Sequence, residues 1–199
     1  MQGELALSAE AIVSLIGQHF ALPGSSRLPV LLVAAAYRAA GARLGERAMP
    51  LLAHNAADVQ THAYGDLHVT LLNDEQIRTC YEMKMRRVTE HDLDHAMKKM
   101  ATAPYLLDNY IFITTDAIDP HVQAYARRLY ATTGVEFIVL DCISFLRHFL
   151  HLFYRLRVPF LDAYQELLLA EPESSVHHAV KEAFLAARLA AESSSRDEA

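Results

Sequence analysis

The sequence predicts an α/β fold in which a central mixed sheet is flanked by helices and followed by a helical C-terminal part. Two runs near the middle of the chain, 66–72 and 77–86, alternate apolar and polar residues, which is typical of a β-hairpin. A strand–helix–strand unit follows over 109–141, and such a unit joins parallel strands. An antiparallel hairpin beside a parallel pair makes the sheet mixed.

The composition is that of a globular protein with no membrane-spanning segment. The 199 residues are 52% hydrophobic and 21% charged. The apolar stretch at 28–40 is interrupted by Pro29 and Arg38 and is too short to cross a bilayer. The first residues lack the pattern of a secretory signal, and two cysteines are too few for a disulfide framework, so we expect a cytoplasmic protein. The net charge of -6 disfavours a protein that coats nucleic acid by bulk electrostatics.

The N-terminal part, 8–45, is expected to hold two helices. Apolar residues recur at helical spacing over 8–20, and Ser8 is a suitable N-cap. A second helix is expected over 28–44, with Pro29 in its first turn, where a missing N–H costs little. The segment 45–65 contains several turn-forming residues, and we expect it to be a long irregular loop.

The elements after the hairpin follow from caps and periodicity. Thr89 is the expected N-cap of a helix over 89–101, and Gly134 is expected to end a helix over 120–134. The strands of this unit are 109–116 and 135–141, the second a continuous apolar run. The remaining chain reads as three helices, one ending before Pro159, one from Pro159 to about 172, and one over 174–192.

The hairpin sorts its side chains onto two faces. One face is apolar, and the other carries Asp66, His68 and Thr70 with Arg78, Cys80, Glu82, Lys84 and Arg86. The two polar sets share a face only if even positions pair with even positions. A three-residue loop, 74–76, gives that register and sets Asp66 beside Lys84. A two- or four-residue loop does not, unless a bulge corrects the register.

This polar face has the residue types of a site that hydrolyses phosphodiesters. Two carboxylates from adjacent strands, Asp66 and Glu82, are ligands for a hard divalent cation, and the backbone carbonyl of Met83 is a further ligand. Such a cation activates water and neutralises charge that develops on phosphate. Lys84 reaches the same space and is expected to position the water or stabilise the transition state. The alternative is a solvated ion pair on an exposed sheet face.

Asp66 and the Glu82-x-Lys84 triplet after the hairpin resemble the PD-(D/E)xK nuclease superfamily, with Gly65-Asp66 in place of Pro-Asp. The order of elements is similar to the restriction-endonuclease-like αβββαβ core of that superfamily, although the third strand of its meander is not evident. The segments "SSRLPVLLVAAAY", "HNAADVQTHAYGD" and "YEMKMRRVT" are most similar to SacI-type restriction endonucleases.

The resemblance implies a metal-dependent endonuclease that cleaves double-stranded DNA, in restriction or another defence. It implies Asp66 and Glu82 as metal ligands, Lys84 as the catalytic lysine, and Mg²⁺ as the cofactor, with Mn²⁺ as a substitute. The alternatives are a catalytically silent nuclease-fold module that binds DNA or protein, and a repair, junction-resolving or toxin nuclease of the same superfamily.

Four further residues are weaker candidates. Asp58 would supply another carboxylate if the loop before the hairpin folds over it, and the alternative is a local cap or turn. His68 shares the polar face and is a candidate for contact with DNA or with a metal-bound water; the alternative is a merely packed or solvated residue. Arg86 and Arg87 follow the motif and are candidates for contacts with DNA phosphates.

We expect one nuclease domain over 1–191, with a helical N-terminal part at 8–45, a catalytic α/β core at 54–141 and a helical C-terminal part at 142–191. Residues 192–199 form a polar tail. Besides DNA, the expected partner is a second copy of the chain or a separate recognition domain or subunit. A homodimer would suit an enzyme that cuts both strands, and an apolar series in the C-terminal part is a candidate interface: Phe145, Phe149, Leu152, Phe153 and Leu156.

Overall fold

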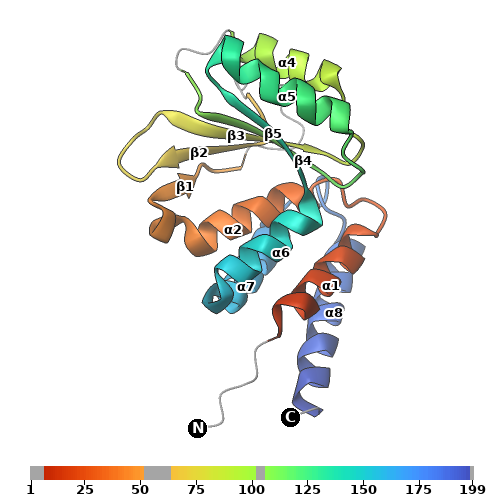
Figure 1. Ribbon diagram of the computed structural model, residues 1–199. Helices are drawn as coiled ribbons and strands as arrows, with labels where there is room; N and C mark the ends of the chain where they lie inside the picture. Colours follow the sequence, from red (N-terminus) through yellow and green to blue (C-terminus); the bar gives the residue numbers. More distant parts are fainter. Residues whose placement is uncertain (1–6, 52–63, 102–105, 198–199) are drawn as a thin grey trace. The chain divides into compact units, whose positions relative to one another are not determined.

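A computed structural model describes residues 7–51, 64–101 and 106–197 of the chain (Figure 1). The chain forms two compact units. The first combines the two ends of the chain, Met1–Ala40 and Phe145–Ala199, and the second is the continuous segment Gly41–Ser144. The second unit contains the sheet.

The sheet is mixed, as the alternation and the strand–helix–strand unit predict, but it has five strands, because β1 joins the four that we expected. Its strands lie in chain order, β1-β2-β3-β4-β5. Strand β2 is antiparallel to both of its neighbours, β1 and β3, whereas β3, β4 and β5 run parallel. Their bounds are Glu46–Ala48 for β1, Leu67–Leu71 for β2, Ile77–Lys84 for β3, Asn109–Thr114 for β4 and Glu136–Asp141 for β5.

Strand β1 lies inside the segment that the sequence predicts to be an irregular loop, so that prediction is wrong for these residues. It spans only Glu46–Ala48 and pairs antiparallel with β2, with Glu46 opposite Leu71. Three residues, two of them charged, are too few to show a period-two pattern. The strand is recognisable only from its partner.

Helices α4, Glu90–Met100, and α5, Pro120–Thr133, cover one face of the sheet (Figure 1). Both begin and end where the caps predict. Thr89 is the N-cap of α4, and α5 ends at Gly134, whose φ of 70° is left-handed and therefore suits glycine. The hydroxyl of Tyr125 on α5 donates to Asp94 on α4 at 2.5 Å and joins the two helices.

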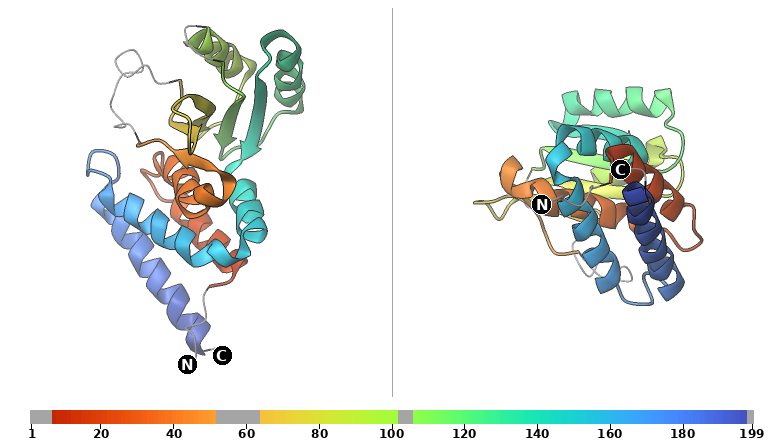
Figure 2. Two further views of the ribbon diagram at one scale, coloured as in Figure 1. Left: turned by 90° about the vertical axis from the view of Figure 1, so that its left-hand side faces the viewer. Right: turned by 90° about the horizontal axis from the view of Figure 1, so that it is seen from below.

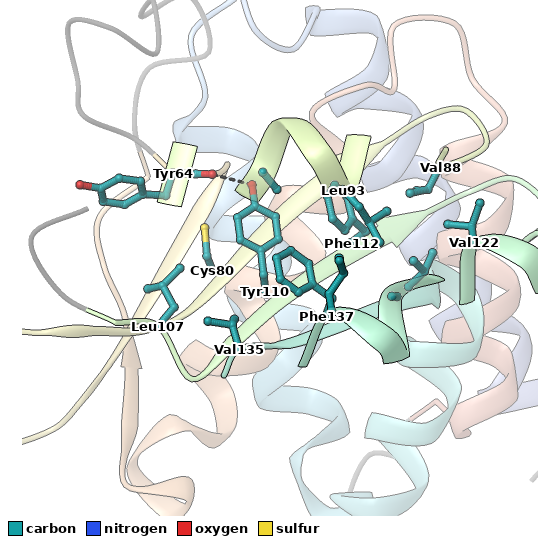
Figure 3. Close-up of a cluster of buried hydrophobic side chains, with 14 of the residues drawn as sticks. Tyr64, Cys80, Val88, Leu93, Leu107, Tyr110, Phe112, Val122, Val135 and Phe137 are labelled. Carbon is teal, nitrogen blue, oxygen red and sulfur yellow. Dashed lines mark hydrogen bonds between the residues drawn. The ribbon is translucent and has the colours of Figure 1, made fainter. Parts of the chain in front are cut away.

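A hydrophobic core lies between these helices and the sheet (Figure 3). Tyr110 and Phe112 of β4 are fully buried at its centre, and Tyr110 stacks on Phe137 of β5 with ring centroids 5.7 Å apart. Helix α4 contributes Leu93 and Ala96, and α5 contributes its own apolar stripe: Val122, Ala126 and Leu129. The core packs against β3, which carries Glu82 and Lys84 of the candidate site, and against β4, which carries Tyr110.

The first unit is helical. It contains α1, Ala9–Phe20, the larger part of α2, Leu28–Leu44, and most of α6, Cys142–Leu152, followed by α7, Arg157–Ala170, and α8, His178–Asp197. Helices α7 and α8, drawn in blue, lie side by side in the left-hand view of Figure 2. As predicted, Ser8 caps α1, and its side chain accepts a hydrogen bond from the amide of Ala11 at 3.1 Å.

The C-terminal helices differ from the prediction in two places. The first of them, α6, ends at Leu152 and is followed by a short 3-10 helix, Tyr154–Leu156, whereas we expected it to continue to Pro159. Helix α7 begins at Arg157, so Pro159 lies in its first turn, close to the predicted start. Helix α8 continues to Asp197, so most of the residues expected to form a polar tail are helical. In the apolar series, Phe149 and Leu156 are buried in the core, whereas Leu152 is 64% exposed.

Both cysteines are buried, and neither forms a disulfide. No helix in the described part of the chain is long and apolar enough to span a membrane.

Candidate functional site

In the hairpin of β2 and β3, even positions pair with even positions, as predicted, because of a bulge. Near the turn Thr70 lies opposite Ile77, but from Val69 onward the register shifts, so that His68 lies opposite Cys80. Even positions therefore pair with even positions over the strand that carries the motif. The three-residue loop that we expected does not produce this pairing. The bulge, which was the alternative to that loop, produces it.

Asp66 lies against the backbone of β3 on both sides of Glu82. Its amide donates to the carbonyl oxygen of Tyr81 at 2.8 Å. Its carboxylate oxygen Oδ2 accepts the amide of Met83 at 2.7 Å. The sequence predicts that Asp66 stands beside Lys84, and the structure instead fixes it at Met83, one residue nearer the hairpin turn.

The approach of Asp66 to β3 requires the glycine before it. A Cβ atom at Gly65 would lie 2.5 Å from the carbonyl oxygen of Tyr81 and 2.7 Å from the sulfur of Cys80. Any side chain there, including that of proline, would push the segment away from β3. The close approach of this segment to β3 therefore requires a glycine directly before Asp66.

Glu82 is a buried carboxylate whose two oxygens have different partners. Its side chain is 9% exposed, and Oε1 forms an ion pair of 2.6 Å with the ammonium of Lys84. Oxygen Oε2 accepts a hydrogen bond from the hydroxyl of Tyr110, on the neighbouring strand β4. The pair of Glu82 and Lys84 is therefore not the solvated ion pair on an exposed face that was the alternative prediction.

Tyr110 was not among the predicted site residues. Its hydroxyl also lies 2.6 Å from the carbonyl oxygen of Tyr64, in the segment that leads to Asp66 (Figure 3). Burial, with the nearby Cys80 and Glu82 adding to it, holds the pKa of this hydroxyl well above its ordinary range. The hydroxyl therefore keeps its proton and acts as a donor to Glu82. A sequence signal existed, because a tyrosine in a buried apolar strand needs a partner for its hydroxyl.

Asp92 is a second site residue that sequence patterns do not reveal, because an acid in the first turn of a helix is typical of a complement to the helix dipole. Its carboxylate accepts two hydrogen bonds from the guanidinium of Arg86, at 2.7 and 2.9 Å. It also accepts the amide and the hydroxyl of Thr89, each at 2.9 Å. Burial alone would raise the pKa of Asp92, but these donors and the charge of Lys84 outweigh it and hold that pKa well below its ordinary range.

The weaker candidates have different surroundings. His68 is half-buried, its Nε2 accepts the amide of Tyr64 at 3.3 Å, and burial lowers the pKa of its ring. The guanidinium of Arg86 is held by Asp92, whereas the side chain of Arg87 is exposed and its amide donates to Asp116 at 3.1 Å. Asp58 lies outside the described residues.

The oxygen atoms of this region are of the types that a hard cation prefers as ligands. In an antiparallel pair the N–H and C=O of one residue point to the same side, so the carbonyl of Met83 lies on the side of β3 where Asp66 binds its amide. Asp66, Glu82 and this carbonyl therefore offer oxygen ligands of the type that Mg²⁺ prefers. Among the described residues, no three His, Cys, Asp or Glu side chains gather into a metal-binding group. The metal site that we expect, formed by Asp66, Glu82 and the carbonyl of Met83, contains only two side chains of these four types.

No protein-family model matches the sequence, and no curated protein matches it either. The function of the chain must therefore be inferred from the arrangement of its own side chains.

Proposed function

We propose that the chain is a metal-dependent endonuclease that hydrolyses DNA phosphodiester bonds, with a role in restriction or another defence against foreign DNA. The observation that carries the proposal is the geometry around Glu82. Asp66 is hydrogen-bonded to the residues on both sides of Glu82, and Lys84 pairs with the Glu82 carboxylate itself. The acid directly before β2 and the acid and lysine of β3 are the residues that the resemblance assigns to catalysis.

The strand order supports the same proposal. Three antiparallel strands, β1, β2 and β3, are followed by the crossover helix α4 and by β4, parallel to β3. This is similar to the αβββαβ order of the superfamily, in which β1 would be the third strand of the meander. The restriction-endonuclease-like core is part of the proposal.

Each residue has a defined role in the proposed reaction. Asp66, Glu82 and the carbonyl of Met83 would hold Mg²⁺, or Mn²⁺ in its place, and the bound cation would activate water and stabilise charge on the phosphate. The amide of Met83 orients the Asp66 carboxylate, and the hydroxyl of Tyr110 orients Glu82. Lys84, only 23% exposed, would place its ammonium at the scissile phosphate, where water is partly excluded and its charge acts strongly.

A catalytically silent module that binds DNA or protein is the second candidate. The observation that favours it is that Glu82 is already satisfied by Lys84 and Tyr110, so the carboxylate needs no cation to be stable in the core. Substitution of Lys84 distinguishes the two candidates, because a silent module would lose only stability.

The test is cleavage of supercoiled plasmid DNA in the presence and absence of Mg²⁺. We expect nicked and linear products from the wild type with Mg²⁺, and a loss of at least about a hundredfold in rate for Asp66→Asn and Lys84→Met. Glu75→Gln, on the exposed turn of the same hairpin, is the matched control and should cleave normally. Cleavage that survives both site substitutions contradicts the site, and a wild type that binds DNA without cleaving it supports the silent module.

A further inference from the structure

The ammonium of Lys84 lies between two carboxylates. It is 2.6 Å from Oε1 of Glu82 and 3.8 Å from Oδ1 of Asp92. The first distance is that of a charge-assisted hydrogen bond, and the second is at the outer limit of an ion pair. In this structure Lys84 is therefore bound to Glu82, with Asp92 beside it as a second partner.

Asp92 is fixed in place by groups other than Lys84. Arg86 and Thr89 bind both of its oxygens, and its side chain is only 7% exposed. A carboxylate held in this way keeps its position whether Lys84 approaches it or not. The charges of Glu82, Lys84, Asp92 and Arg86 thus alternate in sign along one short path.

The ion pair with Lys84 competes with the proposed role of Glu82. A cation held at about 2.0–2.1 Å from a Glu82 oxygen would lie close to the ammonium, and the two positive charges would repel each other in a poorly hydrated site. Lys84 must then leave Glu82, at least in part, when a cation binds. A lysine that leaves one carboxylate in a buried region needs another partner.

We propose that Asp92 is a positioning residue that takes the ammonium of Lys84 from Glu82 when a divalent cation binds. This inference rests on the proposed function. Asp92 acts through Lys84: it lowers the cost of releasing Glu82, and it keeps the ammonium close to the site instead of letting it turn into solvent. Its partner Arg86 competes with Lys84 for the same carboxylate.

The test is a titration of the full chain with Mn²⁺, with bound and free ion measured by electron paramagnetic resonance. We expect Asp92→Asn to weaken Mn²⁺ binding about tenfold while Lys84 is present. In the Lys84→Met background, where no ammonium has to be moved, the same substitution should cost less than about threefold. Asp94→Asn, on the same helix, is the matched control and should leave the affinity unchanged in both backgrounds. Equal losses from Asp92→Asn in the two backgrounds overturn the proposal.

Arg86→Gln gives a second test that does not depend on the folding of Asp92→Asn. Removal of the competing guanidinium leaves Asp92 to Lys84, so Mn²⁺ should bind more tightly, by about threefold. If Asp92 and Arg86 have a merely structural role, Arg86→Gln should instead weaken the binding of Mn²⁺. Weaker binding by Arg86→Gln therefore overturns the proposal. If neither the wild type nor Lys84→Met binds Mn²⁺, the proposed metal-dependent function itself fails. Tight binding without any coupling to Asp92 contradicts only the role of Asp92.

Discussion

The hydroxyl of Tyr110 hydrogen-bonds to the carboxylate of Glu82 from the neighbouring strand, inside a core where the tyrosine ring is fully buried. The contact joins β3 to β4 at the residue that carries most of the proposed chemistry. It also gives a buried carboxylate one of the two partners it needs, since a buried charge without partners is costly.

Replacement of Tyr110 by phenylalanine should therefore lower the free energy of unfolding by about 1–3 kcal/mol, because Glu82 loses its donor in the core. Urea denaturation measures this loss. Tyr125→Phe is the matched control, since its hydroxyl binds Asp94 at a partly exposed position, and we expect it to cost about 0.5–1 kcal/mol. Equal losses from the two variants would show that the contact with Glu82 has no special weight.

Gly65 should tolerate no side chain. We expect Gly65→Ala to lower the free energy of unfolding by about 1–3 kcal/mol, because its Cβ would lie within 2.5 Å of the carbonyl oxygen of Tyr81. The control is Gly17→Ala in α1, where a Cβ meets nothing within 4 Å, and alanine should stabilise the helix by about 0.5–1 kcal/mol. Thermal unfolding of both variants measures the difference in sign, and stabilisation by Gly65→Ala would contradict the close approach.

His19 should make the helical unit sensitive to mild acid. Its ring is buried, with Nδ1 3.0 Å from the hydroxyl of Tyr164 and Nε2 3.0 Å from the carbonyl oxygen of Val180. Burial lowers the pKa of His19 below its ordinary value of 6.5. As the pH falls below about 6.5, the unfolded chain takes up this proton before the folded chain does, so the free energy of unfolding decreases.

Urea denaturation of the wild type and of His19→Gln, at pH values between about 7 and 5, measures this effect. The variant should show a smaller decrease in stability than the wild type over that range. His148→Gln replaces an exposed histidine of α6 and should keep the wild-type dependence on pH. A wild-type slope in His19→Gln would mean that the proton is taken up elsewhere.

Much of the candidate site could be predicted because its logic is local. Period-two alternation gives the face shared by Glu82 and Lys84, and Asp66 follows from the hairpin. The bulge between Val69 and Thr70 brings even positions opposite one another. It has no local sequence signature, because it depends on how the two strands pack against the core. The prediction that even positions pair with even positions was therefore right, whereas the predicted three-residue loop was wrong.

The partners of the site could not be predicted because they come from other elements. Tyr110 reaches Glu82 only when β4 lies parallel to β3 in the observed register, with Tyr110 opposite Cys80. Asp92 reaches Lys84 only through the turn between β3 and α4. Short elements were missed for a related reason: β1 has three residues, and its hydrogen bonds to β2 define it more than its sequence does.

The most direct test of the central claim is a crystal structure of the chain soaked in Mn²⁺, with the ion located from its anomalous scattering. We expect one peak bound by carboxylate oxygens of Asp66 and Glu82 and by the carbonyl oxygen of Met83, each at about 2.1–2.2 Å, slightly longer than the distances of Mg²⁺. The ammonium of Lys84 should have moved away from Glu82. A peak elsewhere would contradict the claim that the hairpin of β2 and β3 forms a metal site. The absence of any peak, with Lys84 still paired with Glu82, would also contradict it.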